Sequence, residues 1–148
     1  MTKTIQLEMI TPEKVALKTT AEFVVLPAVN GEMGVLPGHE PYLVQLETGE
    51  VRATSDGELH SYAIAGGFAE IVQNKVSVFA ETADMASEID AEAARQELER
   101  ARAETTRRDL DPLTLAAAEG AMRLAMIKLR VAGLRGRKRH PEQNPPMG

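Results

Sequence analysis

The spacing of apolar residues changes near residue 86, and this change limits the folds open to the chain. In residues 1–85, short apolar runs alternate with polar residues, which is the spacing of half-buried strands. Glycine and proline then disappear between Ala86 and Asp111, and apolar residues recur at helical spacing. All aromatic residues, 3 Phe and 2 Tyr, precede the change, whereas alanine and arginine dominate after it. The sequence therefore predicts a β domain over residues 1–85 followed by an α domain.

The first part carries the signals of short strands joined by tight turns. Ile5, Leu7 and Met9 share one face of a predicted half-buried strand. Less regular pairs with the same spacing follow at Phe23 and Val25, and at Val51 and Ala53. Because no helix signal separates these runs, the pattern predicts an antiparallel sandwich or barrel.

Three short stretches predict turns and irregular backbone. Asp56-Gly57 is the pair that a two-residue hairpin turn prefers, and Gln73-Asn74 separates two further strand-like runs. Gly66-Gly67 lies inside a strand-like run, where glycine indicates a bulge or a close approach of another backbone.

Two helices are predicted after residue 86. Ser87 or Asp90 caps the first, and Asp111-Pro112 supplies an N-cap and a proline at the first helical position of the second, which we expect to end at Gly133. The residues expected to form the contact between the two helices, their seam, recur at helical spacing. They are Ala94, Leu98, Ala101 and Thr105 on the first helix, and Leu113, Ala117, Gly120, Leu124, Ile127, Val131 and Leu134 on the second. The short connection at residues 107–111 favours an antiparallel two-helix hairpin over residues 86–134.

The small side chains of this seam bury little area. We therefore expect a hairpin of modest stability that needs the β domain or another protein, and that adopts more than one arrangement. Residues 135–148 are basic and contain proline, which predicts a disordered tail. Its cations are either solvated or docked on an acidic protein surface. The net charge of −5 and the distant aromatic residues argue against a dedicated nucleic-acid reader.

No motif points to catalysis, a cofactor or a metal. The chain has no cysteine, its 3 histidines lack metal-ligand spacing, and neither a phosphate-binding loop nor a G-x-S-x-G sequence occurs. His39 and Glu40 are adjacent, but neighbouring residues of an extended chain point in opposite directions, so a loop or interface role is favoured over an acid–base pair. No apolar run is long enough to span a membrane and no signal peptide is recognisable, so a cytoplasmic location is expected.

Residues 31–43 are unusually constrained, since 3 glycines and 2 prolines fall within this loop-like stretch. Glycine permits positive φ angles and proline fixes φ, so the loop is shaped rather than loose. Such a loop is either a corner of a β-fold or a surface held in one form for a partner.

The sequence G-E-M-G-V-L-P-G-H-E-P within this stretch resembles a segment of the ε subunit of bacterial F-type ATP synthase, which is equivalent to the mitochondrial δ subunit. Gly66-Gly67-Phe68, the N-K-V-S-V run from Asn74, and Ala80-Glu81-Thr82-Ala83 support the resemblance. It covers residues 3–134 and implies an N-terminal antiparallel β-sandwich followed by a C-terminal antiparallel two-helix hairpin.

The resemblance implies a non-catalytic rotor subunit of the central stalk, peripheral to the cytoplasmic face of the bacterial inner membrane. Its sandwich would contact the γ subunit and the polar loops of the c-ring. The residues that match family positions at or near the c-ring are Gly31, Glu32, Gly34, Pro37, Gly38 and His39. The hairpin of many relatives also extends along γ to the α/β catalytic head and inhibits ATP hydrolysis. Arg123, Lys128 and Arg130 resemble the basic residues that meet the β subunit there.

One position departs from the family pattern. Some relatives bind ATP through I-D-x-x-R-A, whereas this chain has Ala93 where that arginine is expected. An alanine cannot replace a guanidinium fork for phosphate, so weak or absent ATP binding is predicted. The alternative reading of the chain is a free-standing β-sandwich module that senses a nucleotide or binds another ligand.

Overall fold

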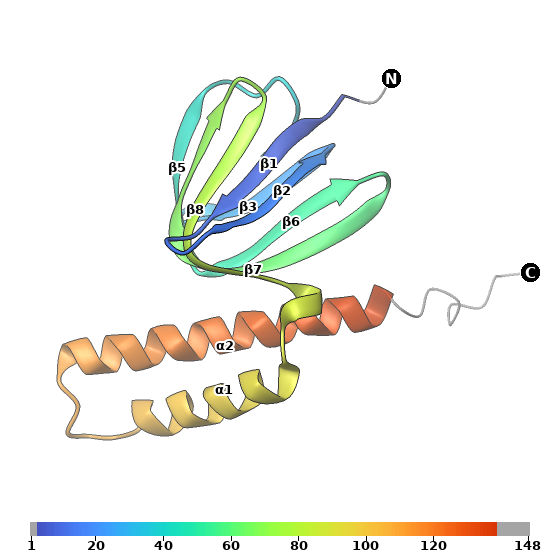
Figure 1. The fold of residues 1–148 in the computed structure, drawn as a ribbon. Coiled ribbons are helices and arrows are strands. Elements are labelled where there is room, and N and C mark those ends of the chain that lie inside the picture. The colour runs from blue at the N-terminus through green and yellow to red at the C-terminus, as the bar shows by residue number, and fades with distance from the viewer. Residues whose placement is uncertain (1–2, 139–148) are drawn as a thin grey trace, which may run out of the picture. The chain divides into compact units, whose positions relative to one another are not determined.

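The computed structural model describes residues 3–138, which fall into two compact units divided between Met85 and Ala86. The first unit contains only strands, and the second contains two long helices (Figure 1). The predicted fold class, a β-sandwich followed by a helical hairpin, is confirmed. The shift of apolar spacing near residue 86 therefore marks a real change of architecture.

Eight strands form the first unit. They are β1 (Ile5–Ile10), β2 (Val15–Ala21), β3 (Phe23–Ala28), β4 (Gly31–Val35), β5 (Tyr42–Leu46), β6 (Gly49–Ser55), β7 (Glu58–Val72) and β8 (Lys75–Met85). The strand order is β2-β1-β8-β7-β5-β3-β4, and β6 pairs with both β3 and β7. Strand β7 is 15 residues long, and it pairs through its first half with β6 and through its second half with β5. It therefore belongs to both sides of the sandwich, and Figure 1 shows it curving between them.

One ladder differs from an all-antiparallel arrangement, because β1 runs parallel to β8. Every other paired strand is antiparallel. Residues alternate between the two faces of a strand in either orientation, so the period-two pattern carries no information about this pairing.

The core confirms the predicted inward face of β1, where Ile5, Leu7 and Met9 are each 1% exposed. Val51 and Ala53 are buried as well. The inward face expected for β3 is wrong by one residue, since Val24 and Leu26 are buried whereas Phe23 is 37% exposed. The ring of Phe23 instead covers Gly34 of β4, where an added Cβ would lie 2.9 Å from it. Both faces of β3 carry apolar residues, so alternation alone could not choose between them.

Both predicted hairpin turns are confirmed. Ser55 pairs with Glu58 across Asp56 (φ 51°) and Gly57 (φ 78°). Val72 pairs with Lys75 across Gln73 (φ 49°) and Asn74 (φ 64°). Two consecutive positive φ angles define the type I′ turn, whose twist matches that of the strands it joins.

Gly67 marks a close approach of two backbones. The register between β7 and β8 continues across Gly66, from Ala65 opposite Thr82 to Gly67 opposite Ala80, so the glycine pair is not a bulge. A Cβ on Gly67 would overlap the carbonyl oxygen of Phe79. Glycine is therefore required where β7 passes from β6 to β5.

We predict that Gly67→Ala lowers the free energy of unfolding by about 3 kcal/mol, because the methyl group would push β8 away from β7. Gly66→Ala is the matched control, since its Cβ would lie 3.4 Å from the Leu46 carbonyl oxygen, an ordinary contact. It should change stability by less than about 1 kcal/mol. Urea denaturation of both full-length variants measures the difference, and equal stabilities would contradict the steric explanation.

The second unit is an antiparallel hairpin of α1 (Ala91–Thr105) and α2 (Pro112–Lys138), preceded by the short 3₁₀ helix η1 (Ala86–Glu88). Asp90 caps α1 by accepting a hydrogen bond from the Ala93 backbone N–H at 3.1 Å. Asp111 accepts one from the Thr114 backbone N–H at 2.7 Å, and this bond lowers the pKa of Asp111. The two N-terminal signals therefore work as predicted.

The predicted seam is confirmed on α1 and only in part on α2. Ala94 and Ala101 of α1 are buried as expected. On α2 the predicted Val131 is buried, but the buried positions also include Ala118 and Ala125, and the predicted Leu113 is 84% exposed. Alanines and leucines occur on several sides of this helix, so spacing alone did not fix which side faces α1. Among the described side chains of the hairpin, the buried positions other than Val131 are alanines, which bury little area.

Helix α2 continues through Gly133 to Lys138, so the expected stop at Gly133 is wrong. Glycine inside a helix costs only about 1 kcal/mol relative to alanine and does not by itself end a long helix. The first residues of the predicted tail, 135–138, are consequently helical. The rest of that tail, residues 139–148, lies outside the described residues.

Candidate functional site

The constrained stretch spans β4, a connection and β5. Within the connection, the His39 backbone N–H donates to the Leu36 carbonyl oxygen at 3.1 Å, closing a four-residue turn. Pro37 occupies its second position and Gly38, with φ 84°, its third. Proline followed by a residue with positive φ is the signature of a type II turn. The glycine and the proline are therefore explained by backbone geometry.

The turn is tied to the rest of the sandwich by Asn74, which lies between β7 and β8. Its Oδ1 accepts a hydrogen bond from the Gly38 backbone N–H at 2.9 Å. Its Nδ2 donates to the Thr4 carbonyl oxygen at 2.8 Å, just before β1. One side chain thus joins three segments that are far apart in the sequence.

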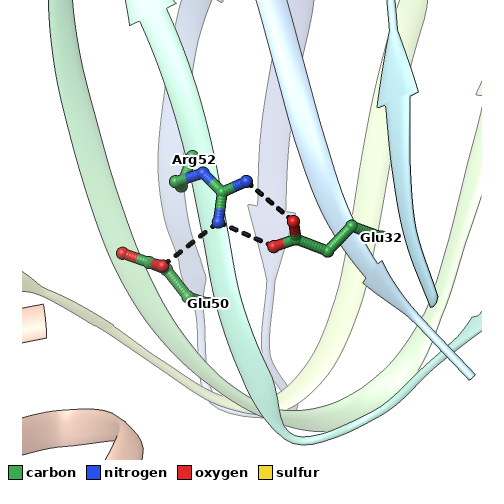
Figure 2. A network of polar contacts seen from close by, with 3 residues as sticks. All are labelled: Glu32, Glu50 and Arg52. Atoms are coloured by element: carbon green, nitrogen blue, oxygen red, sulfur yellow. Dashed lines mark hydrogen bonds and ion pairs between the residues drawn. The ribbon is translucent and has the colours of Figure 1, made fainter. Parts of the chain in front are cut away.

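Glu32, on the edge strand β4, is held by a second interaction. Arg52 of β6 donates to both of its carboxylate oxygens, from Nη1 at 2.7 Å and from Nη2 at 3.0 Å (Figure 2). Strand β3 lies between the two residues, since Glu32 pairs with Pro27 and Arg52 with Val25. The bidentate pair therefore spans β3 and fixes the position of a carboxylate that remains 58% exposed.

Arg52 also contacts a second carboxylate. Its Nη1 lies 3.3 Å from Oε1 of Glu50, whose side chain is only 5% exposed. The hydrogen bond to Glu32 is the largest of the effects that raise the pKa of Arg52, so this guanidinium stays charged. The Arg52 guanidinium thus forms ion pairs with an exposed carboxylate, Glu32, and a buried one, Glu50 (Figure 2).

His39 and Glu40 form no acid–base pair. The Nδ1 of His39 donates to the backbone carbonyl oxygen of Glu40 at 2.7 Å, so the ring contacts the main chain rather than the carboxylate. The ring lies 6.4 Å from that of Tyr42, measured between centroids. This arrangement shapes the exposed end of the connection and agrees with a loop or interface role.

The predicted surface residues thus divide into two groups. Gly31, Glu32 and Gly34 belong to β4, and Pro37, Gly38 and His39 belong to the turn. Sequence reasoning missed the residues that hold these groups, Arg52 and Asn74. Only the strand register could have revealed Arg52, because its pairing with Glu32 depends on two separate ladders.

The three basic residues proposed on α2 do not share one face. Arg123 and Arg130 are exposed and lie two turns apart. Lys128 is partly buried, and it points about 140° away from Arg123 around the helix. A single flat acidic surface could therefore meet the two arginines together but not all three residues.

The start of α1 carries the residues that match the ATP-binding pattern of some relatives. Asp90 is engaged as the N-cap, and Arg95 is paired with Glu92 at 2.6 Å. Ala93 contributes its backbone N–H to the cap. Weak or absent ATP binding stays a prediction.

Comparison with known proteins places this geometry in a family. Residues 4–86 match the model of the beta-sandwich domain of the ATP synthase delta/epsilon chain. The ATP synthase epsilon chain of Herpetosiphon aurantiacus is 44% identical over 132 residues, covering 88% of this chain and 96% of the relative. The chain belongs to the ATP synthase epsilon chain family.

Further relatives agree with this assignment. The ATP synthase epsilon chain of Syntrophobacter fumaroxidans is 42% identical over 89% of this chain and 98% of its own length. A chain in the structure of the Euglena gracilis mitochondrial ATP synthase with OSCP, F1 and c-ring superposes with a TM-score of 0.73. The two are 28% identical, and the match covers 88% of this chain and 81% of that one.

Family membership makes the chain a central-stalk component of an ATP synthase, a complex associated with a membrane. Among residues 3–138, no helix combines the length and the apolar character that crossing a bilayer requires.

The Arg52 contacts lead to a stability prediction. Arg52→Met would leave the buried Glu50 carboxylate without its cation, and we expect the free energy of unfolding to fall by about 3 kcal/mol. Adding Glu50→Gln should restore part of that loss, because the uncompensated charge is then removed. Glu32→Gln alone should cost less than about 1 kcal/mol, because its carboxylate is exposed.

Urea denaturation of the four full-length proteins, including the wild type, measures these differences. If Glu50→Gln had no effect in the Arg52→Met background, the stabilising role of Arg52 toward Glu50 would be excluded.

Proposed function

We propose that this chain is a non-catalytic rotor subunit whose residues 31–39 rest on the polar loops of a c-ring. The observation that carries the proposal is the double anchoring of an exposed surface, by Arg52 at Glu32 and by Asn74 at Gly38. A rotating contact transmits torque only if it resists displacement. Hydrogen bonds from distant parts of the chain, β6 and the β7–β8 turn, supply that resistance to an exposed surface.

The chemistry of this surface suits a polar loop that also carries apolar groups. It presents the Glu32 carboxylate, the His39 ring and the Leu36 side chain, which is 59% exposed. Charge and hydrogen bonding would select the orientation, and the apolar side chain would contribute contact area.

In this proposal the other partners are the γ subunit and, through the hairpin, the α/β catalytic head. The complex lies at the bacterial inner membrane, with this chain on its cytoplasmic face. The alanine seam of α1 and α2 supports a hairpin with two arrangements of similar free energy, one compact and one extended. In the extended arrangement, Arg123 and Arg130 would meet an acidic segment of the head, with Lys128 on another side of the helix.

We predict that Glu32→Lys in the assembled enzyme lowers ATP-driven proton pumping relative to ATP hydrolysis, because it reverses the charge of the exposed carboxylate and breaks its pair with Arg52. It should also reduce the amount of c subunit recovered with the tagged chain from gently solubilised membranes. The matched control is Glu13→Lys, the same charge reversal at an exposed residue in the connection between β1 and β2.

Wild-type pumping and c-subunit recovery with Glu32→Lys would refute the proposed contact. Recovery of the tagged wild-type chain without any ATPase subunit would favour the free-standing ligand-binding or nucleotide-sensing module instead.

The inhibitory role of the hairpin has its own test. Ending the chain after Ser87 removes both helices while leaving the sandwich. We expect ATP hydrolysis by the assembled enzyme to rise by roughly threefold or more. That rise corresponds to a change of at least about 0.65 kcal/mol in the free-energy difference between inhibited and active enzyme. The substitutions Arg123→Ala and Arg130→Ala together should reproduce part of the increase, whereas Arg108→Ala, in the connection between the helices, should not. Unchanged hydrolysis in the truncated form would exclude inhibition by the hairpin.

A further inference from the structure

Asn74 occupies a turn position that few residues tolerate. It is the second residue of the β7–β8 turn and has a φ of 64°. Asparagine and glycine adopt this conformation more readily than other residues do. Glycine alone would satisfy the turn, so the presence of a side chain calls for another explanation.

The contacts of the carboxamide supply one. The Gly38 backbone N–H can only donate and therefore faces Oδ1, whereas the Thr4 carbonyl oxygen can only accept and therefore faces Nδ2. The backbone carbonyl oxygen of Asn74 also accepts a hydrogen bond from the Gln6 N–H at 3.0 Å. An amide side chain of this length matches both partners, and neither a carboxylate nor a hydroxyl would do so equally well.

The Gly38 N–H is available because of the type II turn. That turn uses the His39 N–H to close on Leu36, which leaves the N–H of its central peptide pointing outward. Asn74 takes up this donor and thereby links the tip of the connection to the ends of β7 and β8.

We propose that Asn74 is a positioning residue for the c-ring contact. It holds residues 36–39 in place relative to β1 and β8 and thereby keeps His39 and Leu36 at a fixed position relative to Glu32. This inference rests on the proposed function of that surface. Asn74 acts through Gly38 and does not itself touch the partner.

The first test measures the hydrogen bond in the full-length chain. Asn74→Gly keeps the positive φ of the turn and removes the carboxamide, so amide hydrogen exchange at Gly38 should become roughly 3–10-fold faster. The control Gln73→Gly, in the same turn, should leave Gly38 unchanged. Asn74→Asp keeps an acceptor for the Gly38 N–H, so Gly38 should remain protected in that variant. Unchanged exchange at Gly38 in Asn74→Gly would overturn the inference.

The second test uses the assembled enzyme and the ratio of proton pumping to ATP hydrolysis. A lowered ratio in Asn74→Gly with a normal ratio in Gln73→Gly supports the inference, because the added backbone flexibility of a glycine in this turn is common to both variants. A normal ratio in Asn74→Gly together with a lowered ratio in Glu32→Lys overturns the role of Asn74 and leaves the proposed surface intact. Normal ratios in both Asn74→Gly and Glu32→Lys overturn the c-ring contact and, with it, this inference.

Discussion

The close approach of β7 to β8 at Gly67 is the constraint on which the sandwich depends. Strand β7 pairs with β5, β6 and β8, and so it holds both sides of the sandwich together. Where it passes from one side to the other, a side chain at Gly67 would overlap the carbonyl oxygen of Phe79. The same two strands end in the turn that carries Asn74. The packing of the core and the placement of the exposed surface therefore depend on one ladder.

The exposed surface is made rigid by means that differ from those of the core. Core side chains are immobilised by close packing, which requires burial. Glu32 and Gly38 lie at the surface, and their position is set by two polar side chains that reach them from β6 and from the β7–β8 turn. Both anchors use two donors or a donor with an acceptor, which restrains orientation as well as distance. Glycine and proline supply the backbone shape, and the anchors fix where that shape is held.

Local signals predicted well those features that depend on neighbouring residues. The Asp56-Gly57 and Gln73-Asn74 turns, the buried face of β1 and the caps at Asp90 and Asp111 each follow from a few adjacent positions. Features that depend on distant partners were missed or misassigned. Val24 rather than Phe23 faces the core because of pairing with β4 and β6, and Ala118 rather than Ala117 faces α1 because of how the two helices pack. The site shows the same division, since its glycines and prolines stand out in the sequence whereas Arg52 and Asn74 depend on strand register.

The parallel pairing of β1 with β8 has a consequence for the order in which the chain folds. Strand β1 is synthesised before β8, so its edge facing β8 cannot pair until Lys75 and the residues after it have been made. Contacts between such distant segments are entropically costly and form slowly. The Asn74 bond to Thr4 joins residues 70 positions apart, so it belongs to the same late step. A nascent or truncated chain ending before β8 would have β1 paired only with β2, and it would expose an unpaired strand edge that chaperones and other chains can recognise.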